Sequence, residues 1–155
     1  MYQIKKLIVC LDQSDLDETL VRFASFVSRV NQTKKIYFTN VIRNLQIPKE
    51  VLEEFPNLID NMVEERKRQM KDVVDKNFGK KEDIEFSYVV KEGQLSKKIL
   101  KLAHEKSADM IIIGRKEDII RDKSGNAFSP DFIETRMKFS PYIKEAVVFG
   151  EGRPN

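Results

Sequence analysis

The chain has 155 residues, the length of one globular domain. Its 28 basic and 25 acidic side chains nearly cancel to a net charge of +3, unlike the concentrated positive charge of nucleic-acid-binding proteins. One cysteine excludes an internal disulfide, and one cysteine with one histidine cannot form a Cys/His zinc site. The longest apolar run, Leu7–Leu11, is far shorter than the ~18 residues that span a membrane. We therefore expect a cytoplasmic protein that binds neither nucleic acid nor membranes.

Five short apolar segments predict β-strands. Two of them contain the nearly continuous apolar runs Leu7–Leu11 and Met110–Ile113, which are typical of parallel strands buried on both faces of a sheet. In chain order, the five predicted strands are Ile4–Leu11, Lys35–Ile42, Ile84–Val90, Ala108–Ile113 and Glu145–Phe149.

Between these segments, apolar residues recur at three- and four-residue intervals and predict helices. The first helix is expected to begin at Ser14, with Asp17 completing a start that resembles a capping box, and to continue to Val30. The remaining predictions are one short helix within Arg43–Asn57, long helices over Asn57–Phe78 and Leu95–Lys106, and a helix that opens at Ser129-Pro130 and stops before Ser140-Pro141.

The alternation of strands and helices predicts the fold class. Each connection between strands is longer than a dozen residues, which favours parallel pairing with right-handed crossovers. We expect a single α/β domain over residues 1–150, doubly wound and Rossmann-like, with five mainly parallel strands and about four helices. Residues 151–155 are expected to form a tail, and a second domain beyond it in a longer parent chain stays open.

Two loops are the candidate site positions. In an open α/β sheet, ligands bind beyond the carboxyl ends of the strands, at the point where the strand order reverses. Asp12–Ser14 follows the first strand, and Gly114–Lys116 follows the fourth. A carboxylate at Asp12 can accept hydrogen bonds from a ribose or a base, and Gly114 lets a ligand approach the backbone. A helix-capping aspartate and a turn glycine are the simpler interpretations of these two residues.

Together these segments resemble the universal stress protein family. The resemblance is carried by Lys6–Ser14 at the start of the domain, by Val89–Gly93 at the end of the third strand and above all by Leu100–Lys116. It extends over essentially the whole chain. It implies a cytoplasmic α/β domain with a Rossmann-like fold, related to the adenine-nucleotide-binding superfamily.

The resemblance also implies a nucleotide pocket. In ATP-binding members, G-x-x-G and a later G-[ST] follow the fourth strand, and their backbone amides hold the phosphates. Here Glu117 replaces the second glycine and Asp118 follows, and two carboxylates would repel phosphate oxygens. The first glycine of the later pair is also replaced, by Lys123. The family's pocket positions correspond to Asp12 and Val41 at the adenosine, Gly114 onward at the phosphates and, in full, to Asp12, Val41, Ile113, Gly114, Arg115, Ser124 and Gly125.

No motif specifies a catalytic residue or a metal site. Asp15–Thr19 matches the D-x-D-x-T string of haloacid-dehalogenase phosphatases, but the first aspartate of that motif must stand directly at a strand end. Here the strand ends at Asp12, so an acidic cluster at a helix N-terminus is the better interpretation. We interpret Cys10 as a packed strand residue and His104 as a surface residue.

These observations favour a non-catalytic regulatory or stress-response module with a degenerate nucleotide pocket. The alternative is an ATP-binding member of the family with at most slow hydrolysis, so ATP is the candidate cofactor. The last strand, Ala146–Phe149, would be an apolar sheet edge that needs cover. The resemblance implies a homodimer through this strand, and an edge covered by residues 150–155 is the other interpretation. An unknown protein partner stays open.

Overall fold

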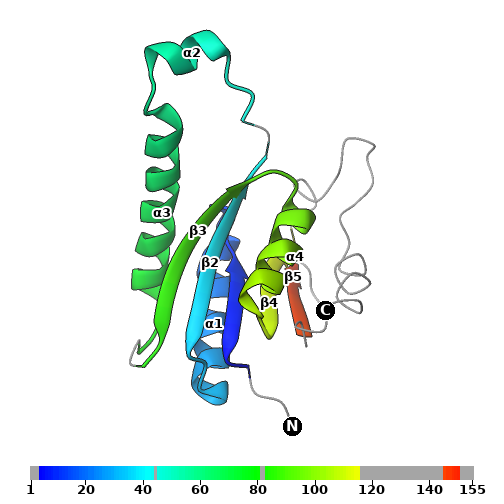
Figure 1. The fold of residues 1–155 in the computed structure, drawn as a ribbon. Coiled ribbons are helices and arrows are strands. Elements are labelled where there is room, and N and C mark those ends of the chain that lie inside the picture. The colour runs from blue at the N-terminus through cyan, green and yellow to red at the C-terminus, as the bar shows by residue number, and fades with distance from the viewer. Residues whose placement is uncertain (1–3, 44, 81–82, 116–144, 151–155) are drawn as a thin grey trace.

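A computed structural model of the chain describes residues 4–43, 45–80, 83–115 and 145–150. Within these ranges, a parallel sheet carries helices on both faces (Figure 1). The predicted α/β fold with a parallel sheet is therefore confirmed. The helix predicted to open at Ser129 lies outside the described residues. Among the described residues, no helix combines the length and the apolar composition that crossing a membrane requires.

The sheet has the strand order β3-β2-β1-β4-β5, and all neighbouring strands pair in parallel. From β1 the chain first adds strands on one side, β2 and then β3, and afterwards on the other side, β4 and then β5. The order therefore reverses between β1 and β4, which makes their carboxyl ends the topological switch point. The strands are β1 (Lys6–Cys10), β2 (Lys35–Ile42), β3 (Glu85–Glu92), β4 (Met110–Arg115) and β5 (Glu145–Gly150).

The described helices are α1 (Leu16–Asn31), α2 (Lys49–Glu54), α3 (Leu58–Asn77) and α4 (Leu95–Lys106). The predicted start of the first helix at Ser14 is wrong by two residues. Asp15 occupies the N-cap position without a side-chain capping bond, while Ser14 Oγ accepts a hydrogen bond from the Leu16 amide at 3.3 Å. Ser14 therefore belongs to the turn that leads into the helix.

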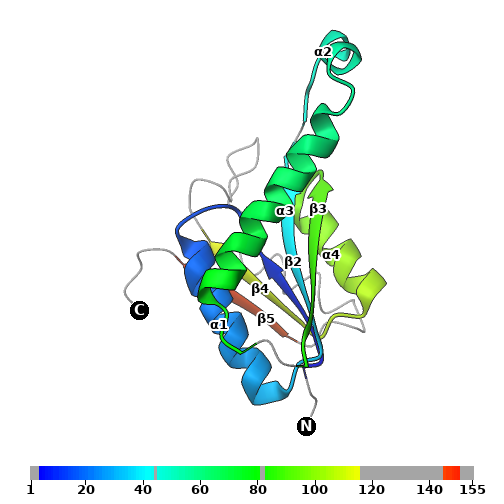
Figure 2. The same cartoon turned by 90° about the vertical axis from the view of Figure 1, so that its left-hand side faces the viewer.

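The core lies in two layers, one on each face of the sheet, because successive strand residues point to opposite faces. Leu7 and Val9 of β1 face α1 and α3, where they pack with Leu20 and Val74. Ile8 faces α4 and packs in a second cluster that includes Ile99, Leu102 and Ala103. Figures 1 and 2 show α1 and α3 together on one face and α4 on the other. The apolar run of β1 is thus explained by burial on both sides.

Four aromatic side chains pack together where α3 meets β2 and β3. The Phe38 ring is fully buried, and it lies 5.3 Å from the Phe86 ring and 5.7 Å from the Tyr88 ring, measured between centroids. Phe78, at the C-terminal end of α3, meets the Phe86 ring edge-on at 4.9 Å. Only Met70 and Val74 of α3 are buried. The C-terminal half of the helix is therefore the part that the core holds in place.

The other end of α3 leaves the core. α2 and the first turns of α3 extend past the carboxyl ends of the strands (Figures 1 and 2). Ile59 and Met62, which the periodicity predicts on the apolar side of this helix, are only half-buried there, and Phe55 is 55% exposed. α3 consequently carries its middle residues, around Arg66, past the edge of the sheet where the switch point lies.

Replacing Phe38 tests the aromatic anchor. Phe38→Ala should lower the free energy of unfolding by about 3–5 kcal/mol, because it empties a fully enclosed site and removes three ring contacts. Phe26→Ala is the matched control, since its ring is 53% exposed. We expect it to change stability by no more than about 0.5 kcal/mol. Urea unfolding of both variants measures the difference, and equal losses would contradict this description of the core.

Candidate functional site

A small cavity opens at the carboxyl edge of the sheet, at the switch point. Its volume is about 200 Å³, and its walls come from the ends of β1, β2 and β4 together with α3 and α4. The residues that line it are Cys10, Leu11, Asp12, Thr39, Asn40, Val41, Arg43, Arg66, Leu95, Ile113 and Gly114. The lining thus combines apolar side chains with charged and amide groups.

The cavity brings together Asp12, Val41, Ile113 and Gly114, four of the seven residues that the sequence assigns to a nucleotide pocket. Arg115 is the last residue of β4, and its side chain is not described. Ser124 and Gly125 lie outside the described residues. That these residues contact a ligand stays a prediction. That four of them share one cavity is a property of the fold.

Asp17 lies in the first turn of α1 and also bonds to the loop before the helix. Its side chain is only 2% exposed, and its carboxylate turns back toward the loop after β1. Oδ1 accepts a hydrogen bond from the Asp12 amide at 3.1 Å, and Oδ2 accepts one from the Gln13 amide at 2.8 Å. The prediction of an acidic cluster at the helix N-terminus is confirmed, because Asp17 and Glu18 stand in the first turn of α1. Asp17 also fixes the backbone that carries Asp12.

The environment of Asp17 shifts its acidity. Burial is the largest influence, and with the nearby negative charge of Asp12 it raises the pKa of Asp17 to about 7. The two amide donors act in the opposite direction by stabilising the carboxylate. Burial outweighs them because it removes the carboxylate from water, which is the largest cost of keeping the group charged.

The backbone of the loop is held in an uncommon conformation. Gln13 has a φ of 66°, in the left-handed region that side chains other than glycine adopt rarely. Asp12 Oδ1 accepts a hydrogen bond from the Ser14 amide at 3.0 Å, and the Asp17 amide donates to the Ser14 carbonyl at 3.1 Å. Residues in such conformations persist where surrounding bonds impose them, and they cluster at functional sites. These bonds fix the backbone of the loop and with it the position of Asp12.

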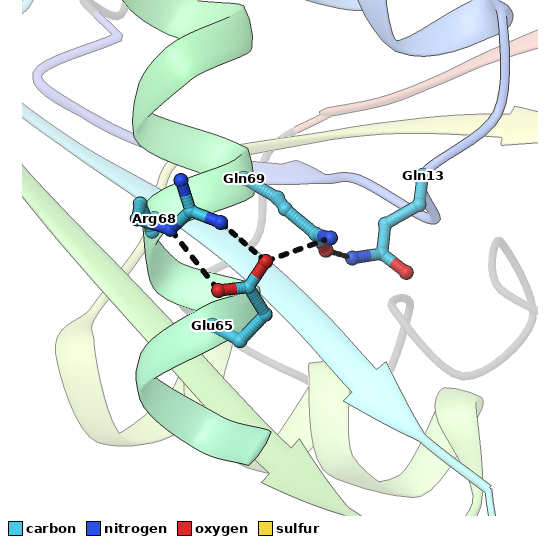
Figure 3. A network of polar contacts seen from close by, with 4 residues as sticks. All are labelled: Gln13, Glu65, Arg68 and Gln69. Atoms are coloured by element: carbon cyan, nitrogen blue, oxygen red, sulfur yellow. Dashed lines mark hydrogen bonds and ion pairs between the residues drawn. The ribbon is translucent and has the colours of Figure 1, made fainter. Parts of the chain in front are cut away.

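Side chains of α3 form hydrogen bonds with the same loop. The Gln13 side-chain amide donates to Gln69 Oε1, and Gln69 Nε2 donates to Glu65 Oε1 at 3.4 Å (Figure 3). Arg68 completes the network, with its Nε 3.0 Å from Glu65 Oε2 and its Nη2 2.5 Å from Glu65 Oε1. These contacts join the loop after β1 to a helix more than fifty residues later in the chain.

Four further polar residues line the cavity, and the sequence predicted none of them as site residues: Thr39, Asn40, Arg43 and Arg66. Asn40 is 3% exposed, and its Nδ2 donates to the Leu11 carbonyl at 2.8 Å. Arg66 Nη1 donates to Gln13 Oε1 at 2.5 Å and to Asn40 Oδ1 at 3.5 Å. An asparagine inside an otherwise apolar strand end could have drawn attention to Asn40. Arg66 is the one basic residue of α3 with no carboxylate three or four positions away, and this spacing could have distinguished it.

Gly114 has a packing role as well as a place in the cavity. A Cβ added there would come within 2.4 Å of Leu16 Cδ2 and within 3.3 Å of Leu20 Cδ1. The missing side chain therefore lets the first turn of α1 lie close to the end of β4. This contact accounts for the glycine without a ligand, so the identity of this residue alone does not indicate nucleotide binding.

Cys10, Asp15 and Asp17 are other groups that the sequence singled out. Burial, together with the charge of Asp12, raises the pKa of the Cys10 thiol far above its usual range, so the thiol stays protonated. Asp15 is exposed, whereas Asp17 is committed to backbone amides. Within the described part of the chain, no group of three or more His, Cys, Asp or Glu residues could hold a metal ion.

The parallel sheet with a crevice at its switch point defines a Rossmann-like α/β protein. A model of the universal stress protein family matches residues 3–125, which is most of the chain. The chain belongs to the universal stress protein family. No curated protein sequence matches it.

Solved structures have the same fold. A universal stress protein in complex with cAMP has 14% identity and a TM-score of 0.61, with 96% of this chain and 98% of that chain covered. The universal stress protein UspA from Lactobacillus plantarum has 14% identity and a TM-score of 0.60, with coverages of 96% and 99%. The universal stress protein from Archaeoglobus fulgidus in complex with dAMP has 18% identity and a TM-score of 0.51, with coverages of 95% and 97%.

The pKa of Asp17 gives a prediction for pH dependence. Because the folded-state pKa of about 7 lies above the ordinary value of 3.8, the stability linked to this group is fully present below about pH 4 and is lost as the pH rises to about 7. Asp17→Asn does not titrate. The free energy of unfolding of the variant, relative to wild type, should therefore rise between about pH 4 and pH 7. Urea unfolding across this range measures it.

Asp15→Asn is the control, since Asp15 is exposed and precedes the same helix. This control retains Asp17 and should therefore show the loss of stability with rising pH that Asp17→Asn lacks. A wild type that gains stability relative to Asp17→Asn as the pH rises would contradict the prediction, because it would mean that the two amide bonds outweigh burial.

Proposed function

We propose that the cavity binds an adenine nucleotide and that the protein is a non-catalytic regulatory module of the stress response in the cytoplasm. The observation that carries the proposal is the convergence of Asp12, Val41, Ile113 and Gly114, which occupy the family's pocket positions, on one cavity. Two structural neighbours are described in complex with cAMP and with dAMP, which supports an adenine nucleotide as the ligand class.

The lining suits the nucleoside part of such a ligand. Leu95 and Ile113 offer apolar surface to the faces of a base, and the Asp12 carboxylate can accept hydrogen bonds from ribose hydroxyls. Pockets that enclose whole drug-sized ligands measure roughly 300–1,000 Å³. At about 200 Å³, this cavity would enclose only part of a nucleotide. The remainder would lie at its mouth.

The absence of catalysis is proposed from the sequence after β4. Glu117 and Asp118 stand where ATP-binding members of the family place a glycine and its neighbour, and carboxylates repel a polyphosphate chain. A pocket that holds a triphosphate poorly has little means of positioning it for hydrolysis. Binding of ATP with Mg²⁺ followed by slow release of phosphate would instead favour the alternative, an ATP-binding member of the family.

Calorimetric titration with AMP tests the proposed function. We expect a Kd below about 100 μM in the wild type and at least a tenfold weaker Kd in Asp12→Ala, which removes the charged acceptor. Asp15→Ala is the matched control, an exposed aspartate outside the cavity, and it should bind like wild type. Asp12→Asn can keep the bond to the Ser14 amide, so it separates loss of charge from loss of loop geometry.

We also propose a homodimer through β5. Among the described strands, β5 pairs with β4 alone and is the last in the sheet order, and a second copy could pair with its other edge. Sedimentation at increasing concentration should show the mass of a dimer. A chain that stays monomeric at high micromolar concentration contradicts this part of the proposal.

A further inference from the structure

We propose that the arm formed by α2 and the first two turns of α3, residues 49–65, is a docking surface for a basic amphipathic helix of another protein. The arm extends past the carboxyl ends of the strands, away from the sheet (Figures 1 and 2). The inference goes beyond the proposed nucleotide site, because none of the residues that line that cavity belongs to the arm. It can therefore be tested without a nucleotide.

The arm carries large apolar side chains that the core does not bury. They are Val51, Leu52, Phe55, Leu58, Ile59, Met62 and Val63. α2 has no buried residue, and the buried residues of α3, Met70 and Val74, lie outside the arm. Phe55, where α2 ends, is 55% exposed. Apolar side chains gathered on a projecting element and bordered by charged residues mark a site of protein interaction.

The apolar stripe of the arm continues a stripe that the sheet covers. Ile59 and Val63 precede Met70 by about three and about two turns of α3, so the three side chains lie along the same side of the helix. Met70 and Val74 pack in the core beneath the C-terminal half of the helix. In the arm, no described strand lies against this stripe (Figures 1 and 2). A docked partner would supply there the cover that the sheet supplies farther along α3.

The arm is strongly acidic, although the chain as a whole carries a net charge of +3. Its single basic residue is Lys49, and its six acidic residues give it a net charge of −5: Glu50, Glu53, Glu54, Asp60, Glu64 and Glu65. Three of these carboxylates lie within 4.0 Å of a lysine or arginine. Among the residues that the structure describes, the carboxylates of Glu50, Glu54 and Asp60 have no basic partner. These three are available to the cations of a docked helix.

The charge of the arm disfavours two other occupants. The arm of a second copy would bring another net charge of −5 against the same surface, and like charges across an interface repel. Amphipathic helices that bind membranes carry lysine and arginine on their polar face to meet anionic lipids, which is the opposite sign. A protein helix with apolar side chains on one face and basic side chains beside them complements both the stripe and the charge.

The experiment measures binding of a fluorescently labelled peptide of leucine and lysine at helical spacing to the full chain, by anisotropy. Phe55→Ala and Phe26→Ala are the matched pair, because the two residues are 55% and 53% exposed and only Phe55 lies in the arm. Asp60→Asn is compared with Asp15→Asn, which removes an exposed charge outside the arm. Unfolding midpoints establish that each variant is folded.

The wild type should bind this peptide, and Phe55→Ala should weaken binding about tenfold, as the loss of an aromatic contact does at protein interfaces. Asp60→Asn should weaken it about twofold at low ionic strength, and added salt should remove this difference by screening the charge. Phe26→Ala and Asp15→Asn should bind like wild type. A peptide of the same composition with its leucines dispersed around the helix should bind about tenfold more weakly, because it offers no apolar face.

The proposal is overturned if the leucine–lysine peptide does not bind, or if Phe26→Ala weakens its binding as much as Phe55→Ala does. Equal binding of a peptide with glutamate in place of lysine would show that the partner is not basic. If sedimentation shows a dimer that Phe55→Ala removes and Phe26→Ala keeps, the arm binds a second copy instead. Binding to phosphatidylserine vesicles that only Phe55→Ala abolishes would assign the arm to a membrane surface.

Discussion

The carboxylate of Asp17, buried beneath the turn that follows β1, accepts hydrogen bonds from the Asp12 and Gln13 amides. These two bonds hold Gln13 in a left-handed conformation that its side chain alone disfavours. The position of Asp12 depends on them directly. The position of Arg66 depends on them through the Gln13 side chain, which accepts its hydrogen bond. The buried Asp17 side chain thus determines the positions of two charged residues at the crevice, Asp12 and Arg66.

The rest of the fold supplies the rigid elements that this turn needs. β1 is buried on both faces, so its carboxyl end has a fixed position between β2 and β4. The ring cluster around Phe38 holds the C-terminal half of α3 against the sheet, while the middle of the helix extends to the crevice. Asn40 ties the end of β2 to the Leu11 carbonyl. These contacts hold the walls of the crevice in position.

The parts of this structure that follow local sequence rules could be predicted, and the parts that depend on distant contacts could not. Apolar runs located β1 and β4, and a reversal of strand order beyond them placed Asp12 and Gly114 at one edge. The place of Asp17 in the first turn of α1 could be predicted, but its hydrogen-bond partners could not, because serine followed by an acid three residues later also fits a capping box. The hydrogen-bond partners of its carboxylate are the backbone amides of Asp12 and Gln13, earlier in the chain. The place of Arg66 at the cavity could not be predicted, because its contacts with Gln13 and Asn40 join segments that are far apart in the chain.

Amide chemical-shift mapping during titration with AMP tests the central claim, a nucleotide crevice at the carboxyl edge of the sheet. The largest shifts should fall on the amides of Asp12, Gln13, Asn40, Val41 and Gly114. A second hollow of polar character lies at the opposite edge, lined in part by Ser28, Thr33 and Gly79, and it serves as an internal reference. Saturable shifts confined to the first set support the account. Shifts confined to the second set, or none at millimolar AMP, contradict it.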